Sequence, residues 1–120
     1  MPFIFSKVNV SISNEQEIKL KSRLGKAIEV LPGLSEQYLM AGFEDNQHIY
    51  LRGDNKEPLA YIEVSIFGNE AHFGYDKLTA EITKIFNEVL NISTKNIYIK
   101  YDDIKDWGAN GINFDRNDYQ

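Results

Sequence analysis

The chain has 120 residues, of which 42% are hydrophobic and 26% are charged, a composition that suits one soluble domain over residues 1–120 with a modest core. The net charge is −5, and the lysines and arginines are scattered, so the sequence shows no basic patch that would bind a phosphate backbone. This argues against a nucleic-acid partner. The absence of cysteine excludes disulfides, thiolate metal sites and cysteine nucleophiles.

The first predicted element is a strand from Pro2 to about Val10, which follows Met1 directly. No basic leader precedes it, and no apolar run in the chain is long enough to span a bilayer. We therefore expect a cytoplasmic protein without a membrane anchor. Secretion without a signal peptide would leave no trace of this kind in the sequence.

A helix is predicted next, because apolar residues recur at helical spacing. Ser13 and Gln16 have the spacing of a capping box at its start, and Pro32-Gly33 ends it. A second strand follows from Tyr38 to Phe43. The apolar stripe of this helix consists of Leu20, Leu24, Ala27, Ile28 and Leu31.

The same three elements recur when the sequence is shifted by 58 residues, which aligns Ile4 with Ile62. A strand from Leu59 to Phe67 leads to a helix that Asn91 can end in the left-handed conformation, and then to a strand from Asn96 to Tyr101. Each half is therefore a β-α-β unit with parallel strands. The apolar stripe of the second helix consists of Leu78, Ile82, Ile85, Phe86 and Val89.

Together the two units predict a two-layer α+β fold, in which a four-stranded mixed sheet carries both helices on one face. Apolar residues on the other face predict association with further copies of the chain in a closed ring. Short extra strands are predicted at His48 to Arg52, where an edge would pair with a neighbouring subunit, and at Asp106 to Phe114. The polar tail from Asp115 to Gln120 is expected either to fray or to lie over a neighbouring subunit.

Several features occur in a characteristic order: Met1-Pro2 opening into a strand, the duplicated β-α-β unit, Ser65-Ile66 in the third main strand, and the stretches from Asn96 to Tyr101 and from Trp107 to Phe114. Taken together, they resemble the macrophage migration inhibitory factor family of the tautomerase superfamily. The resemblance implies a homotrimer with active sites at subunit interfaces and no cofactor. It also implies an N-terminal proline that shuttles a proton between the keto and enol forms of a 2-oxo acid such as phenylpyruvate.

Pro2 is the candidate catalytic base, provided that Met1 is removed. An N-terminal proline is a secondary amine, and burial in an apolar pocket disfavours its protonation and lowers its pKa toward neutrality. A retained Met1 would turn this nitrogen into an amide without basicity. The alternative is a proline that merely begins a strand.

The resemblance implies roles for residues elsewhere in the chain. Tyr98, the second candidate catalytic residue, matches the family's phenol, which donates a hydrogen bond from the adjacent subunit. Ile66, with Ser65 beside it, matches the position whose backbone N–H binds the substrate carboxylate. The residues that match pocket walls are Phe3, Tyr38, Trp107 and Phe114, of which Phe3 and Phe114 are as well explained singly as core aromatics.

The chain departs from the family pattern where the substrate carboxylate binds. The family's lysine after the first helix is replaced by the apolar stretch from Leu31 to Leu34, its glycine after Ile66 by Phe67, and its asparagine two residues after the tyrosine by Lys100. A carboxylate in a partly dry pocket needs a paired charge, so we predict that Lys100 substitutes for the missing lysine. The alternative is that Lys100 points to solvent at a strand end.

Two functions remain open at this point. The first is an enzyme that tautomerises a small 2-oxo acid, and the second is a non-catalytic, cytokine-like interaction protein with a vestigial pocket, which the missing lysine and Phe67 favour somewhat. No metal site is predicted, because His48 and His72 lie far apart in the sequence without a repeated ligand spacing. The sequence names neither the physiological substrate nor a receptor.

Overall fold

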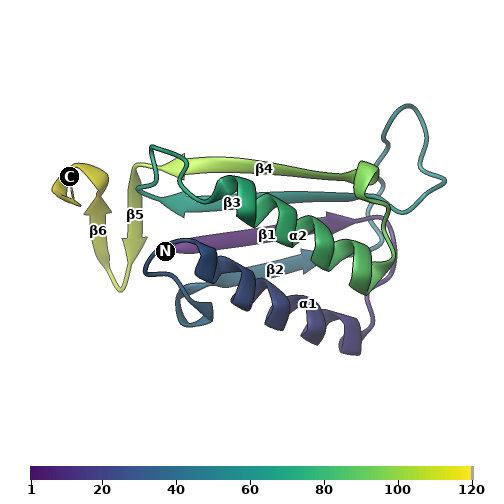
Figure 1. The fold of residues 1–120 in the computed structure, drawn as a ribbon, viewed down its shortest axis with the longest axis horizontal. Coiled ribbons are helices and arrows are strands. Elements are labelled where there is room, and N and C mark those ends of the chain that lie inside the picture. Colours follow the sequence, from purple (N-terminus) through teal and green to yellow (C-terminus); the bar gives the residue numbers. More distant parts are fainter. Residues whose placement is uncertain (120) are drawn as a thin grey trace.

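The computed structural model describes residues 1–119 and consists of a four-stranded sheet with two helices packed on one face, plus a separate two-stranded hairpin (Figure 1). In chain order the strands and α-helices are β1 Pro2–Val8, α1 Asn14–Ala27, β2 Met40–Glu44, β3 Ala60–Phe67, α2 Tyr75–Leu90, β4 Ile97–Ile104, β5 Asp106–Ala109 and β6 Ile112–Asp115. Short 3₁₀ helices lie at Ile28–Val30, Glu36–Tyr38, Thr94–Asn96 and Arg116–Tyr119.

Both β-α-β units predicted from the repeat are present. Strands β1 and β2 are parallel, as are β3 and β4, while β1 and β3 are antiparallel neighbours in the middle of a sheet of order β2-β1-β3-β4. Each helix joins the two parallel strands of its own unit, as a parallel connection requires. The predicted two-layer α+β fold with a mixed sheet is confirmed.

The helix ends follow the signals in the sequence. Ser13 accepts a hydrogen bond from the Gln16 N–H at 3.1 Å, and the Gln16 side chain accepts one from the Ser13 N–H at 2.9 Å, which completes the capping box. At the end of α2, Asn91 has a φ of 57°, in the left-handed region that asparagine tolerates. Local polar chemistry therefore sets the start of α1 and the end of α2. The α-helical part of the first helix ends at Ala27 and continues as a 3₁₀ turn to Val30, just before the predicted stop at Pro32-Gly33.

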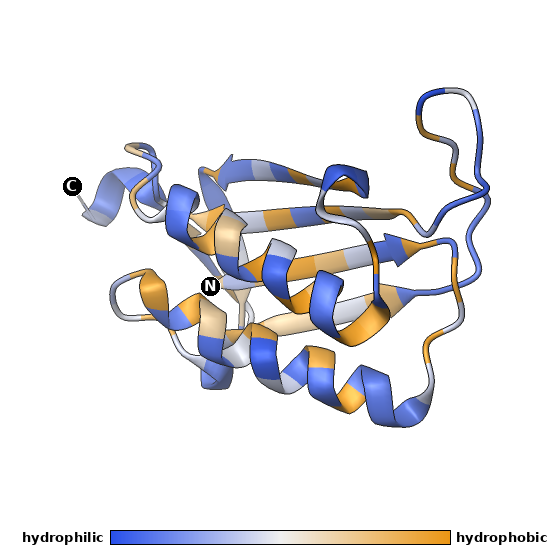
Figure 2. Ribbon diagram, turned by 45° about the vertical axis from the view of Figure 1, so that its right-hand side comes forward, coloured by the Kyte–Doolittle hydropathy of each residue, from blue (hydrophilic) through white to orange (hydrophobic). Residues whose placement is uncertain are grey.

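The core lies between the sheet and the helices. Alternate residues of the two central strands point inward, and Ile4 of β1 and Ile62 of β3 are fully buried there. From the helices, Leu24 and Phe86 are also fully buried. Figure 2 shows hydrophobic residues alternating with hydrophilic ones along the strands and recurring from turn to turn along both helices.

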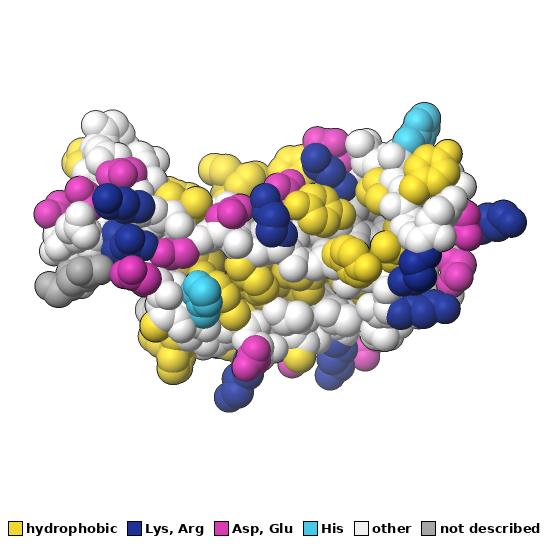
Figure 3. All heavy atoms as spheres, turned by 90° about the horizontal axis from the view of Figure 1, so that it is seen from above, with side chains coloured by type: hydrophobic (Ala, Val, Ile, Leu, Met, Phe, Trp, Pro, Cys, Tyr) yellow, Lys and Arg dark blue, Asp and Glu magenta, His cyan; other side chains and the backbone are white. Residues whose placement is uncertain are grey.

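The other face of the sheet carries no helix in the described part of the chain. Phe3 and Phe5 of β1 lie on it, with ring centroids 5.8 Å apart in an edge-to-face contact. Met40 and Tyr98 also lie on this open face and are 68% and 55% exposed. The space-filling view shows further hydrophobic side chains in the hollow between the body and the lobe at one end (Figure 3).

The strand boundaries differ from the prediction by up to three residues. Strand β1 ends at Val8, β2 begins at Met40 instead of Tyr38, and β4 continues to Ile104 instead of ending at Tyr101. Tyr38 belongs to a 3₁₀ turn, because the N–H of Leu39 bonds back to the carbonyl of Glu36 at 3.1 Å.

The predicted extra strand at His48 to Arg52 is wrong. Within residues 1–119 this segment belongs to a loop that projects beyond the sheet (Figure 1), and it contains only an isolated bridge between Leu51 and Asp54. Arg52 and Gly53 have φ angles of 53° and 91°, so the backbone reverses instead of extending.

The predicted strand at Asp106 to Phe114 is a hairpin, in which β5 pairs with β6 around Asn110-Gly111. Both turn residues have positive φ, as tight hairpins of this kind require. As far as Tyr119, the tail is folded, because Arg116–Tyr119 forms a 3₁₀ helix whose first N–H bonds to the carbonyl of Lys105 at 2.9 Å. Hairpin and tail form the lobe that lies beside the amino terminus in Figure 1.

Candidate functional site

Pro2 is buried at the start of β1, opposite Ile66 of β3 in the antiparallel register. Met1 precedes it and is itself partly buried. Burial lowers the pKa of the Met1 α-amino group below its ordinary value. The start of the chain is therefore a place where the fold disfavours a charged amine.

One backbone contact at this end depends on Met1. Its carbonyl accepts a hydrogen bond from the N–H of Phe67 at 3.2 Å. Antiparallel strands alternate between bonded and non-bonded pairs, so the next pair, Pro2 and Ile66, directs the Ile66 N–H away from β1 and toward β4. The backbone donor that faces the amino terminus is that of Phe67, one residue beyond the predicted Ile66.

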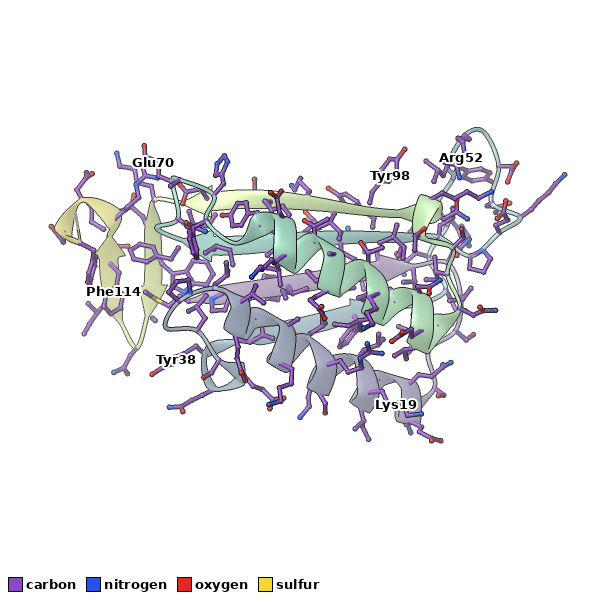
Figure 4. All side chains as sticks on the ribbon, viewed as in Figure 1. Lys19, Tyr38, Arg52, Glu70, Tyr98 and Phe114 are labelled. Atoms are coloured by element: carbon purple, nitrogen blue, oxygen red, sulfur yellow. The ribbon has the colours of Figure 1, made fainter. Side chains whose placement is uncertain are left out.

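A cavity of about 380 Å³ opens where the end of β3 meets the hairpin lobe. Its aromatic wall consists of Phe67, Phe114 and Tyr119. The ring centroids of Phe67 and Tyr119 lie 5.9 Å apart, and those of Phe114 and Tyr119 lie 6.4 Å apart. Figure 4 shows Phe114 on the lobe at the amino-terminal end of the sheet. The other lining residues are Met1, Gly68, Glu70 and Arg116.

A second hollow of about 270 Å³ adjoins this cavity, because Phe67 and Gly68 line both. Its walls include Leu31, Pro32 and Leu34, the stretch at which the family pattern has a lysine. None of the described residues that line this hollow is charged. A cation for a bound anion must therefore come from elsewhere.

Arg116, like Tyr119, is a residue of this site that the sequence reasoning missed. Its side chain is 19% exposed and forms ion pairs with Asp103 and, at 3.9 Å, with Glu70. Asp103 also accepts a hydrogen bond from the Asn69 N–H at 2.7 Å, which ties this cluster to the loop after β3. Arg116 is the one cation between Asp115 and Gln120. The sequence does not show where this tail packs, so it could not predict that Arg116 lines the cavity.

Tyr98 lies on the open face of β4, away from Pro2 of the same chain. The strand register places Pro2 level with Asp103, five residues beyond Tyr98, which corresponds to roughly 16 Å along the strand. Figure 4 shows Tyr98 and Phe114 at opposite ends of the sheet. A site that uses both Pro2 and Tyr98 therefore needs Tyr98 from another subunit.

Lys100 lies on the same open face between two carboxylates. Its Nζ is 3.3 Å from Glu63 and 3.3 Å from Asp102. These hydrogen bonds, that of Glu63 first, raise the pKa of Lys100. A substrate carboxylate at Lys100 would compete with both partners.

The remaining predicted pocket residues lie in separate places. Phe3 pairs with Ser65 across β1 and β3, on the open face. Trp107 pairs with Phe114 across the hairpin. Tyr38 is 56% exposed, and Figure 4 shows it on the turn before β2. Of these five residues, Phe114 is the one that lines the cavity.

The arrangement at this end of the molecule has the parts needed to bind a small organic acid: an enclosed amine position, an aromatic wall and a guanidinium. Over residues 1–119, no group of three or more histidine, cysteine, aspartate or glutamate side chains is placed to hold a metal ion. No helix in that range is long and apolar enough to cross a membrane.

Comparison with known proteins gives a consistent result. A family model described as macrophage migration inhibitory factor (MIF) matches residues 1–114. The curated proteins give no match to this chain. Among solved structures, the chain is similar to Leishmania major MIF2, with a TM-score of 0.87, 29% identity, and coverage of 95% of this chain and 97% of that one.

Two further structures share the fold. The macrophage migration inhibitory factor homologue from Prochlorococcus marinus has a TM-score of 0.79 at 25% identity, covering 93% of this chain and 98% of that one. Pt0534 inactivated by 2-oxo-3-pentynoate has a TM-score of 0.82 at 14% identity, covering 98% of both chains. Because the family model spans nearly the entire sequence, the chain belongs to the macrophage migration inhibitory factor family.

Proposed function

We propose that this protein is a tautomerase that interconverts the keto and enol forms of small 2-oxo acids such as phenylpyruvate, with Pro2 as the base. The observation that carries the proposal is the buried position of Pro2 beside a cavity with an aromatic wall. Burial lowers the pKa of the Met1 α-amino group, and the same surroundings would lower that of a Pro2 amine; a general base works best when its pKa lies near the operating pH. Membership of the family supports the same class of reaction.

The chemistry requires that Met1 be removed, because an amide nitrogen is not a base. In the processed chain, the Pro2 amine takes a proton from C3 of the 2-oxo acid while the oxygen on C2 gains one, so that the keto form becomes the enol without a change in composition. The reverse steps regenerate the keto form. The proline ring restricts φ, which keeps the nitrogen in one direction.

The proposal includes a homotrimer, as the family resemblance implies. Tyr98 is too far from Pro2 of its own chain, but it is exposed on an uncovered face where a neighbour would dock. In the trimer, Tyr98 of one subunit would donate a hydrogen bond to the substrate held at Pro2 of the next. The residues proposed to complete the pocket in that assembly are Phe3, Tyr38, Ser65, Ile66, Lys100 and Trp107. We place the protein in the cytoplasm.

A second candidate function is that of a non-catalytic interaction protein whose pocket is vestigial. Two observations favour it: the hollow at Leu31 to Leu34 is apolar, and Lys100 is already bound to two carboxylates. The rigid sheet and its exposed face would then serve as the binding surface.

The experiment that separates the two functions is a phenylpyruvate tautomerase assay on protein shown by mass spectrometry to begin at Pro2. The matched control is the same chain with Met1 retained, produced in cells deficient in methionine aminopeptidase, because it differs at no other position. The processed chain is expected to be active and the control inactive. Equal activity of the two would contradict a proline base, and an inactive processed trimer would favour the interaction protein.

A further inference from the structure

The end of β3 holds a backbone donor whose acceptor leaves when Met1 is cleaved. The Phe67 N–H donates to the Met1 carbonyl at 3.2 Å, and this carbonyl is covalently bonded to the Pro2 nitrogen. Removal of Met1 therefore leaves the N–H without its acceptor, directly beside the new amine. A partly enclosed N–H without a partner is unfavourable, so an oxygen of a bound ligand is stabilised at this position.

Arg116 brings a positive charge to the same cavity. Its Nη1 donates a hydrogen bond to Asp103, and its backbone N–H donates one to the carbonyl of Lys105 at 2.9 Å. Both the guanidinium and the backbone of Arg116 are therefore held in place. The Nε atom is buried and has no hydrogen-bond partner among the residues that the structure describes. Donors of the guanidinium therefore remain for a planar carboxylate, which arginine binds through two parallel hydrogen bonds.

We propose that removal of Met1 opens a carboxylate site formed by the Phe67 N–H and the Arg116 guanidinium, and that this site holds the carboxylate of a 2-oxo acid with an aryl side chain. The inference rests on the proposed function and names the groups that bind its substrate. The aryl group lies against the aromatic wall of the cavity, to which Phe114 and Tyr119 belong. The carboxylate takes the place of the Met1 carbonyl, which brings the reacting carbon to the Pro2 amine.

Two carboxylates already face Arg116, and they differ in exposure and in their contact with the guanidinium. Asp103 is 16% exposed and also accepts the Asn69 N–H, so it is part of the scaffold that orients the guanidinium. The Glu70 side chain is 65% exposed and lies 3.9 Å from Nε, beyond hydrogen-bond length. An incoming carboxylate competes with Glu70, and Glu70→Gln is therefore expected to tighten its binding.

Arg116 fits this role better than Lys100 does. Lys100 is bound to two carboxylates on the open face, and the register places it three residues before Asp103 on β4, away from Pro2 of its own chain. It would reach the amine only from a neighbouring subunit. Arg116 reaches the cavity that Met1 lines in the same chain.

The test measures binding of phenylpyruvate to the processed chain separately from turnover. In a Pro2→Gly background, Arg116→Gln is expected to raise the Kd for phenylpyruvate by about tenfold or more, because a charged hydrogen-bond partner is lost. Binding of the uncharged methyl ester is expected to change little. Arg116→Lys should recover part of the affinity. Lys84→Gln, on the exposed side of α2, removes the same charge elsewhere and is the matched control.

An amide NMR spectrum of the unmutated processed chain tests the site even if Arg116→Gln fails to fold. Phenylpyruvate is expected to shift the amide resonance of Phe67 strongly and that of Ile66 less, because the Ile66 N–H is directed to β4. The chain that retains Met1 should show no Phe67 shift, since its own carbonyl occupies the site.

Three results would overturn the site. They are an unchanged Kd for phenylpyruvate in Arg116→Gln, a larger loss of phenylpyruvate affinity in Lys100→Gln than in Arg116→Gln, or a Phe67 amide resonance that does not shift when phenylpyruvate is added. Failure of the proposed function has a different signature. If phenylpyruvate binds with the expected dependence on Arg116 but is not turned over, the carboxylate site stands and the tautomerase proposal falls.

Discussion

At the end of β4 near the amino terminus, Arg116 and Asp103 form an ion pair with side chains 19% and 16% exposed. Halfway along the same strand, Lys100 pairs with Glu63 and Asp102 through side chains that are 32% to 47% exposed. The chain's own hairpin lobe encloses the first pair, whereas the second lies on a face that nothing within residues 1–119 covers. One chain thus sets the electrostatics around Pro2, whereas Tyr98 and Lys100 lie on the open face, which a neighbouring subunit would cover in the proposed trimer.

The largest expected effect is on the turnover rate, and it comes from a change at Pro2, at the buried start of β1. Pro2→Gly replaces the secondary amine by a primary one on a flexible residue, and we expect kcat for phenylpyruvate to fall by about 100-fold or more, as for loss of a general base. Steady-state kinetics measure the change, and gel filtration checks that the assembly is retained. A variant that assembles normally and keeps its kcat would show that this end of the sheet does not perform the chemistry.

The next effect concerns the stability of the two ion pairs. Asp103→Asn leaves Arg116 without its anchoring charge in a mostly enclosed place, and we expect the free energy of unfolding to fall by about 2 kcal/mol. Glu63→Gln is the matched change on the open face. It is expected to lower the free energy of unfolding by clearly less, because solvent screens the ion pair between Lys100 and Glu63. Denaturant titrations of both variants make the comparison, and equal losses would contradict it.

A complementation experiment tests whether Tyr98 acts across subunits. Tyr98→Phe removes the phenol hydrogen-bond donor, and we expect about a tenfold loss of activity. Refolding Tyr98→Phe together with Pro2→Gly would form mixed trimers in which some sites pair an intact Pro2 with an intact Tyr98, so activity above that of either variant alone is expected. If mixing recovers nothing, Tyr98 and Pro2 do not meet at an interface.

The smallest expected effect concerns how kcat/KM depends on pH. The base acts only when it is unprotonated, and burial lowers the pKa of the Met1 α-amino group, the neighbour of the proposed base. We therefore expect kcat/KM to rise with pH through a midpoint below the ordinary pKa of an N-terminal amine and then to level off. A pH profile of the processed chain measures the midpoint, and a value at or above the ordinary pKa would mean that Pro2 is solvated in the assembled protein.

The sequence alone was sufficient to predict features that depend on local periodicity and on capping. The shift of 58 residues that aligns Ile4 with Ile62 indicated two β-α-β units, and both are present. Ser13 begins α1 and Asn91 ends α2 as predicted, because the groups involved are near in sequence. The segment at His48 to Arg52 was misjudged, since its strand-like composition is overridden by a reversal at Arg52.

For the candidate site, the amino-acid sequence by itself predicted Pro2 as the base and Phe114 as a wall residue, and the structure places Phe114 in the cavity wall. The tertiary structure alone decided which cation lines that cavity. Lys100 was the predicted cation because it lies two residues after Tyr98 on the same strand, but strand pairing placed it between Glu63 and Asp102. Arg116 lies in a tail without periodicity, and only the return of that tail over the end of β3 brings its guanidinium to the cavity beside Met1. Contacts between residues so far apart in the sequence arise from packing, which no local pattern encodes.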